Sequence, residues 1–219
     1  MVRSLRVVDA RPGRIVVRRG ELRIVFQQLE PHRAAVLFRH GRLDEAPVPL
    51  GDIRAALADA TVRRAVRVTH LDAVDGIEAK RLPGSLVRAL SATADRRDYA
   101  MLVPEDPDAA LPSPPGRVFR SARRSIPDLP HVQVRVAVGP DPTLRYGASL
   151  LVAAWRDLGL DVRTEHRDAN ARFVRRAAPT SIPIARAVDA RFVSPRVVGW
   201  REDRSGLVDY AAVRLRDGA

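Results

Sequence analysis

The sequence contains no cysteine among its 219 residues. We therefore expect no disulfide, no thiolate metal site, no cysteine nucleophile and no lipidated cysteine. Histidine is scarce too, and the five histidines show none of the short spacings with which two histidines ligate one metal ion. Neither a metal nor a cofactor is expected. The histidines are His32, His40, His70, His131 and His166.

Long apolar segments are also missing. No run of about 18 apolar residues occurs, which is the length that a membrane-spanning helix needs. Near the N-terminus, the charges of Arg3, Arg6 and Asp9 interrupt the apolar stretch that a secretory signal requires. The sequence taken alone therefore predicts a chain without a membrane span, which either stays in the cytoplasm if it is made as given or is a piece of something longer.

Lysine is nearly absent, whereas arginine is abundant. Lys80 is the only lysine among 38 basic residues, and Asn170 is the only asparagine. This skew is typical of a GC-rich coding sequence. The net charge is +12, but most arginines alternate with acidic residues, as in residues 41–100 with 10 basic and 9 acidic side chains. We interpret the charge as a solvated, salt-bridged surface and do not expect nucleic acid as the partner.

A second interpretation of the charge stays open, namely an arginine-rich module that binds nucleic acid or an acidic partner. Residues 1–40 carry 9 basic and 3 acidic side chains, a clear local excess. Dedicated nucleic-acid binders concentrate their charge on one face or tail. An affinity that falls steeply with salt would identify such a module, because phosphate contacts release counterions.

The overall composition is that of a folded chain. Hydrophobic residues make up 46% and charged residues 29%, and 219 residues suffice for one domain or two small ones. Residues 14–18 and 22–26 have strand character on either side of a turn at Gly20. A helix is predicted from Glu30 to a glycine cap at Gly41.

The next segments alternate between extended and helical patterns. Residues 44–49 are predicted to be extended, because their two prolines are incompatible with a helix. Asp52 is expected to cap a second helix, and a third helix is expected to begin near Pro83. Residues 182–198 again have strand character, and the C-terminal segment ends in a short extended piece.

The clearest unit lies between residues 132 and 163. Valines alternate over 132–138, a turn follows at 139–142, a helix ends at Gly159, and a strand begins again at 160–163. This βαβ order implies a parallel pair of strands, and it predicts an α/β or mixed α+β fold. Apolar residues form one stripe along the helix, and we place Trp155 in the core. The stripe consists of Leu144, Ala148, Leu151, Trp155 and Leu158.

Proline marks the predicted domain organisation. Residues 104–130 contain seven of the 17 prolines, which is typical of an extended connector or of a long surface loop within one domain. We predict a strand–helix segment over 1–103, a connector over 104–130, and a βαβ unit with C-terminal return strands over 131–219.

No sequence motif points to catalysis. Nucleotide-binding, metalloprotease and hydrolase motifs are missing, and no spacing selects a nucleophile with its base, so we predict a protein that is not an enzyme. The turn at 139–142 is either a plain turn or a weak anion site at a helix N-terminus.

Candidate ligand-binding residues are few. Arg145 and Tyr146 in the first helical turn either face a cleft or lie on the plain surface. Trp200 either lines a groove or caps the core from a loop, and the same two alternatives apply to Tyr210. We name these four because binding pockets combine aromatic surface with a few polar groups.

Five segments together carry a family resemblance. They occur in one order along the chain: Ile24–Phe26, the step His40–Pro49, the helix of residues 86–96, residues 132–162, and the return formed by 182–184, 193–200 and 209–215. In this order they resemble the family 5 extracellular solute-binding proteins, which serve peptide/nickel-type ABC importers.

This resemblance implies a fold of the periplasmic-binding-protein type II class. It implies binding of an oligopeptide or similar solute between two lobes that close about a hinge, without catalysis and without a cofactor. Members of the family act outside the cytoplasm with an ABC permease, and we expect a monomer. The residues that match the family look structural: Gly41, Asp44, Arg88, Asp95 and Gly199.

The chain is also shorter than members of that family, so the resemblance implies a truncated relative. A shortened lobe buries less of a ligand, so we expect weak binding. It also exposes apolar surface, which we place near Ile15–Phe26 and Phe192–Trp200, unless the two ends of the chain pair with each other.

Overall fold

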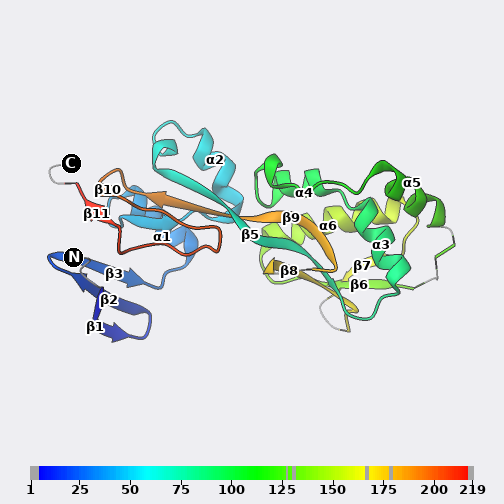
Figure 1. Cartoon of the computed structure of the whole chain (residues 1–219), viewed down its shortest axis with the longest axis horizontal. Helices are drawn as coiled ribbons and strands as arrows, with labels where there is room; N and C mark the ends of the chain where they lie inside the picture. The colour runs from blue at the N-terminus through cyan, green and yellow to red at the C-terminus, as the bar shows by residue number, and fades with distance from the viewer. Residues whose placement is uncertain (1–4, 127, 130–131, 166–167, 178–179, 217–219) are drawn as a thin grey trace. The chain divides into compact units, whose positions relative to one another are not determined.

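The computed structural model describes residues 5–126, 128–129, 132–165, 168–177 and 180–216 (Figure 1). The chain divides into two compact units. Unit 1 consists of Met1–Thr69 and Asp189–Ala219, and unit 2 consists of His70–Val188. Two long strands, β5 (Val66–Ala79) and β9 (Ile182–Val193), each contain one of the boundaries.

The described strands form three sheets. Their orders are β1-β2-β3, β10-β11 and β4-β9-β5-β8-β6-β7. The other elements before β5 are β1 (Arg6–Arg11), β2 (Arg14–Arg19), β3 (Leu22–Gln27), α1 (Pro31–Arg39), β4 (Glu45–Pro47), η1 (Leu50–Asp52), α2 (Ile53–Ala58) and η2 (Arg63–Ala65). Those after β5 are α3 (Gly84–Thr93), α4 (Arg96–Leu102), η3 (Pro107–Ala109), α5 (Gly116–Ser125), β6 (Val134–Ala137), α6 (Pro142–Asp157), β7 (Val162–Glu165), β8 (Ala171–Ala177), β10 (Val197–Val198) and β11 (Arg214–Leu215).

The N-terminal hairpin of unit 1 is confirmed. β2 and β3 pair antiparallel around Gly20, whose φ of 61° suits a residue without a side chain. β1 adds to the other edge of β2. This third strand was not predicted, because most of its residues are exposed and its apolar residues do not alternate.

Helix α1 begins and ends where the sequence predicts. The Glu30 carboxylate accepts the backbone N–H groups of His32 and Arg33, both at 2.9 Å, and Gly41 follows the helix with a φ of 67°. Helix α2 also begins after Asp52, but the predicted cap is wrong, since the Asp52 side chain makes no capping hydrogen bond. The reason is that the Asp52 backbone already has helical geometry as the end of η1.

One apolar cluster forms the core of unit 1 around Phe192 on β9. The ring of Phe192 stacks on that of Phe38 from α1, with centroids 5.1 Å apart. Small residues of α1 and β4 let the helix approach the strand closely. The buried members are Ala34, Ala35, Ala46, Val48, Ile53, Ala56, Val66, Ala190 and Phe192.

Unit 2 contains the predicted βαβ unit. β6 and β7 are parallel, with Val134 opposite Val162, and α6 connects them. Trp155 lies in the core as predicted, fully buried, and its indole N–H donates to the Leu90 carbonyl at 3.2 Å. None of the helices in the described part of the chain is long and apolar enough to cross a membrane.

The proline-rich segment is more ordered than its sequence suggests. Residues 116–125 form α5, Ala109 is fully buried, and the Leu111 N–H donates to the Ile184 carbonyl at 3.2 Å, all within unit 2. Five of the seven prolines precede the helix, and the last of these five, Pro115, lies just before its first residue, where proline is tolerated. The division into units therefore differs from the predicted boundary, because the chain passes between them inside β5 and β9, where no proline or glycine cluster marks the change.

The two ends of the chain pair within unit 1. The Arg19 guanidinium donates to the Val213 carbonyl, and the rings of Phe26 and Tyr210 meet edge-to-face at 4.8 Å. Apolar surface remains exposed on the hairpin, as predicted, including Ile15 at 45% and Val25 at 44%. The same expectation is wrong for the start of the return, since Phe192 and Val193 are buried against α1 and β4.

The residues that look structural in the family resemblance occupy defined positions. A side chain at Gly199, where φ is 78°, would bring its Cβ within 2.5 Å of the Ala212 carbonyl oxygen. The Asp95 side chain accepts the Asp98 N–H at 3.0 Å and so caps α4. Asp44 pairs with Arg196. Arg88 is exposed on α3.

Gly147 on α6 provides a test of the packing in unit 2. Helix propensity alone favours alanine over glycine by about 1 kcal/mol. However, a Cβ at this position would lie 2.3 Å from Cγ2 of Val103 and 3.0 Å from Cε2 of Tyr99, and both side chains are fully buried. Because overpacking a rigid core costs about 1–3 kcal/mol, we expect Gly147→Ala to lower the free energy of unfolding in a denaturant titration.

Gly139→Ala serves as the control, since a Cβ there meets no atom within 4 Å. We expect this control variant to unfold within about 0.5 kcal/mol of the parent chain. A Gly147→Ala variant that is more stable than the parent would contradict the close packing of α6 against α4.

Candidate ligand-binding groove

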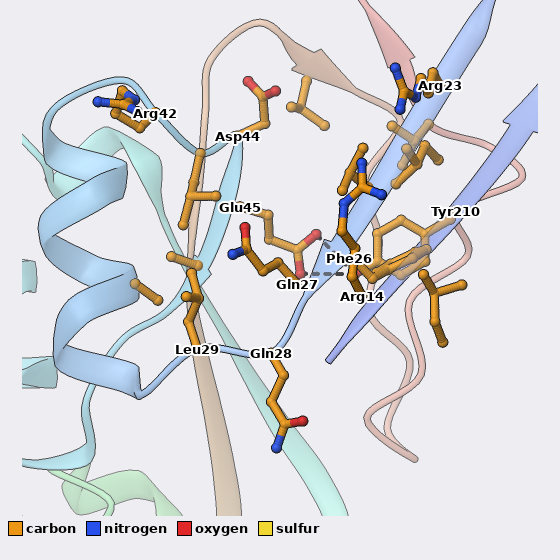
Figure 2. Close-up of a pocket in the computed structure, with 18 of the residues that line it drawn as sticks. Arg14, Arg23, Phe26, Gln27, Gln28, Leu29, Arg42, Asp44, Glu45 and Tyr210 are labelled. Atoms are coloured by element: carbon orange, nitrogen blue, oxygen red, sulfur yellow. Dashed lines mark hydrogen bonds between the residues drawn. The ribbon is translucent and has the colours of Figure 1, made fainter. Parts of the chain in front are cut away.

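Unit 1 contains an open groove with a volume of about 730 Å³ (Figure 2). Every residue of β3 and of β4 lines it, and both strands lie at an edge of their sheet. The lining combines apolar residues with charged and amide side chains, five of which are arginines. Its apolar residues include Ile15, Leu22, Ile24, Phe26, Leu29, Leu43, Ala46, Val197 and Val213.

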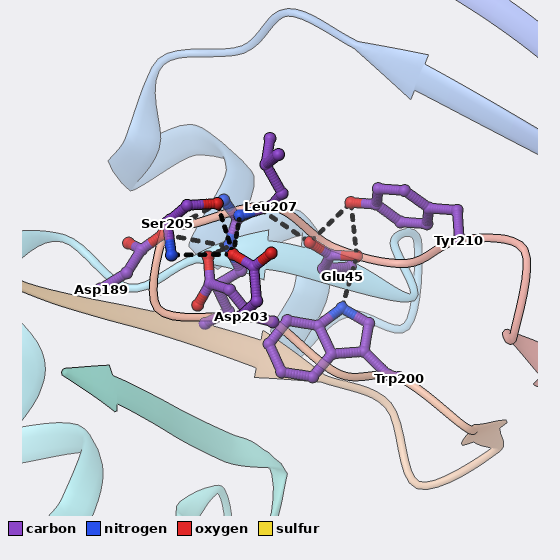
Figure 3. A network of polar contacts seen from close by, with 9 residues as sticks. Glu45, Asp189, Trp200, Asp203, Ser205, Leu207 and Tyr210 are labelled. Carbon is purple, nitrogen blue, oxygen red and sulfur yellow. Dashed lines mark hydrogen bonds and ion pairs between the residues drawn. The ribbon is translucent and has the colours of Figure 1, made fainter. Parts of the chain in front are cut away.

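The carboxylate of Glu45 on β4 binds three side chains (Figure 3). The Trp200 indole N–H donates to it at 3.0 Å, the Tyr210 hydroxyl at 3.0 Å, and the Arg191 guanidinium at 2.8 Å. Burial, followed by the charge and hydrogen bond of Glu45, raises the pKa of Tyr210 above its usual range, so the hydroxyl keeps the proton that it donates.

A second layer of charge lies behind Glu45. Arg191 on β9 also contacts Asp189 at 3.2 Å and Glu202 at 3.3 Å, and the Glu202 side chain is completely buried. Burial alone would lower the pKa of Arg191, but Asp189, Glu45 and Glu202 outweigh it and raise that pKa. One cation thus faces three carboxyl groups.

This imbalance favours a proton on Glu202. Burial, followed by the hydrogen bond and charge of Asp189, raises the pKa of Glu202 to about 7, against the opposing effects of Thr69 and Arg191. A protonated Glu202 donates to the Asp189 carboxylate and removes one negative charge from the buried cluster. The cluster is therefore suited to holding the loop after β10 in place, rather than to acid–base chemistry on a substrate.

Two arginines of the groove are free to meet a ligand. Figure 2 shows Arg42 on the side of α1 and Arg23 on the side of β3. Neither side chain makes an ion pair or a hydrogen bond with another described residue, whereas the Arg14 side chain pairs with Asp9 at 2.9 Å. The groove thus offers apolar surface, aromatic edges and two unpaired cations.

The structure brings two of the four predicted ligand-binding residues together. Trp200 and Tyr210 both line the groove and share Glu45. Arg145 and Tyr146 belong to unit 2, where Tyr146 is 60% exposed. Arg145 lines a smaller pocket of about 280 Å³ with Val138, Ser149, Thr164 and Glu165.

The predicted turn before α6 is occupied by its own residues. The Asp141 carboxylate accepts the Leu144 N–H at 3.0 Å, and Arg145 donates to the Gly139 carbonyl at 3.2 Å. The backbone amide of Leu144 is therefore unavailable to an anion. Of the five histidines, His131 and His166 lie outside the described residues. Among the described residues, no group of three or more histidines and acids is arranged to hold a metal ion.

Sequence reasoning missed Glu45, Arg191 and Glu202. Only a weak signal was available, namely an acid within a short extended segment and two charges two residues apart on a strand, Asp189 and Arg191. Opposite charges on one face of a strand indicate that the two side chains pair, but they do not indicate that Glu45 on another strand joins them.

Neither a protein-family model nor a curated protein sequence matches the chain. Solved structures do match in fold. An ABC transporter substrate-binding protein from Listeria monocytogenes, CtaP, aligns with a TM-score of 0.74 at 9% identity, over 96% of this chain and 66% of its own.

Two peptide-binding proteins give similar values. OppA of Haemophilus influenzae, solved in complex with the peptide RPPGFSPFR, has a TM-score of 0.67 at 12% identity and is covered over 64% of its length. The pheromone receptor PrgZ, described with its mode of peptide binding, has a TM-score of 0.68 at 10% identity and is also covered over 64%. The chain therefore has the periplasmic-binding-protein-like fold expected from its sequence, and it spans about two thirds of the length of these proteins or less.

Glu202 predicts how stability depends on pH. Its pKa of about 7 in the folded chain exceeds the ordinary value of 4.5. Folding is therefore accompanied by uptake of a proton at pH values between about 4.5 and 7. The stabilisation is full below about pH 4.5 and is lost as the pH rises through about 7. From about pH 5.5 to about pH 8.5 we expect the free energy of unfolding to fall by about 1–3 kcal/mol on this account.

Glu202→Gln removes this titration and keeps an amide that can donate to Asp189. We expect its stability to fall less over the same pH range in matched urea titrations, while the exposed control Glu21→Gln follows the parent chain. Equal pH dependence of the parent and Glu202→Gln would show that the buried carboxyl holds no extra proton.

Proposed function

We propose that this chain is the solute-binding component, or a shortened relative of one, of an ABC importer. The observation that carries the proposal is an open groove lined by apolar, aromatic and charged residues, in a chain whose fold matches peptide-binding proteins of ABC transporters. The solute class that fits best is an oligopeptide or a similar molecule. An ABC permease would be its partner, and binding would involve neither a covalent step nor a cofactor.

In this proposal the side chains have distinct roles. Trp200 and Tyr210 present aromatic surface to the solute, and Glu45 fixes both by accepting their N–H and O–H groups. Arg23 and Arg42 supply charge for a carboxylate of the solute. Apolar burial supplies most of the affinity, and the few polar groups set orientation.

The openness of the groove sets the expected affinity. A ligand held along one open groove leaves part of its surface in water. Each Å² of apolar ligand surface that stays exposed lowers the binding free energy gained by about 25 cal/mol. About 150 Å² left exposed costs close to a thousandfold in Kd. We therefore expect micromolar or weaker binding by this chain.

Calorimetry against a pool of short peptides tests the proposal. We expect heat of binding from the parent chain and at least about tenfold weaker binding by Trp200→Ala and by Tyr210→Ala, because aromatic anchors carry much of the affinity of such sites. The matched control is Leu207→Ala, a residue of the same loop that is 70% exposed and does not line the groove. Circular dichroism establishes that each variant is folded.

Two results would count against the proposal in different ways. A parent chain that gives no heat and no thermal shift with any pool is not a peptide-type solute binder. Binding that is unchanged in both aromatic variants places the solute somewhere other than this groove.

A further inference from the structure

Helix α5 of unit 2 is the most basic helix of the described chain. Its ten residues contain four arginines and no acidic residue, and the nearest acids in the sequence, Asp108 and Asp128, lie outside it. Averaging over longer stretches hides this cluster, because acids on either side offset it. The four residues are Arg117, Arg120, Arg123 and Arg124.

These arginines are also unpaired. None of their side chains makes an ion pair or a hydrogen bond with another described residue, and no residue of α5 is buried. Other arginines of the chain behave differently: Arg175 pairs with Asp75, Arg191 with Glu45, and Arg196 with Asp44. The charge of α5 is therefore not used to stabilise the fold.

The arrangement of α5 is amphipathic. Arg117, Arg120 and Arg124 follow at intervals of three and four residues and share one face of the helix. Apolar residues form the opposite stripe, of which Val118 is 46% exposed and Phe119 is 36% exposed. The helix packs against α3, but that contact leaves both apolar side chains partly open to water.

We propose that α5 docks the protein on an anionic lipid membrane. A helix with one positive face and a partly exposed apolar face on the opposite side fits the boundary between lipid headgroups and acyl chains, where both faces find a partner. Four unpaired arginines complement the negative surface of such a bilayer, and each contributes about a fivefold gain in partitioning. A nucleic-acid backbone would use the arginines but would leave Val118 and Phe119 without a role. This docking is independent of solute binding in unit 1.

Vesicle co-sedimentation of the full chain tests the proposal. The vesicles are an equimolar mixture of phosphatidylglycerol and phosphatidylcholine, with pure phosphatidylcholine as the neutral comparison, at about 0.1 M salt. The test variant carries Arg117→Gln, Arg120→Gln and Arg124→Gln. The matched control carries Arg97→Gln, Arg201→Gln and Arg204→Gln, which removes the same charge from exposed positions outside α5.

The parent chain and the control should sediment with the anionic vesicles and not with neutral ones. The α5 variant should bind about a hundredfold more weakly, and Phe119→Ser alone should also weaken binding. Circular dichroism verifies that all variants are folded, and peptide calorimetry should give the same result for the α5 variant as for the parent.

Three outcomes overturn the proposal. The parent chain fails to sediment with anionic vesicles, or the control loses as much binding as the α5 variant, which indicates a general charge effect. The third outcome is that duplex DNA displaces the chain from vesicles while Phe119→Ser leaves vesicle binding unchanged. This result would indicate a surface that binds nucleic acid instead.

Discussion

The carboxylate of Glu45 is the contact on which the arrangement of unit 1 depends. It joins β4 to β9 through Arg191 and to the C-terminal segment through Trp200 and Tyr210. The Tyr210 ring then packs edge-to-face on Phe26 of the N-terminal hairpin. Because these donors are partly buried, removal of Glu45 would leave the Trp200 N–H and the Tyr210 O–H without their acceptor, which costs more than either bond contributes. The groove exists where these parts meet.

Arginine has separate uses in the two units, and the difference lies in its partners rather than in its number. In unit 1, Arg191 is half-buried among three carboxyl groups and holds the loop that carries Trp200. In unit 2, Arg175 lies beside the buried carboxylate of Asp75, which also accepts the Arg176 backbone N–H. The side chains of the α5 arginines have no such partner among the described residues, and this difference is the basis of the proposed docking on an anionic surface. A single net charge of +12 therefore does not describe one function.

The elements that the sequence predicted well are those fixed by nearby residues. The β2–β3 hairpin, the Glu30-capped helix and the βαβ unit each depend on a turn, a cap or a stripe within about 35 residues, which a pattern can reveal. β5 and β8 were missed because their burial depends on strands far away in the chain, and α5 was hidden by the prolines before it. The site was predicted only in part. Trp200 and Tyr210 were chosen as aromatics, but Glu45 lies more than 150 residues before them, and no local pattern links the three.

The most direct test of the role of Glu45 is hydrogen exchange of the C-terminal segment. Amides of this segment are bonded within it, such as Asp203 N–H to the Leu207 carbonyl and Asp209 N–H to the Arg201 carbonyl. In Glu45→Ala we predict that protection of these amides falls by about tenfold or more, since the segment loses its buried anchor. The neighbouring control Asp44→Ala, which removes an exposed ion pair with Arg196, should leave it unchanged. Equal protection in the parent chain and Glu45→Ala would contradict the account.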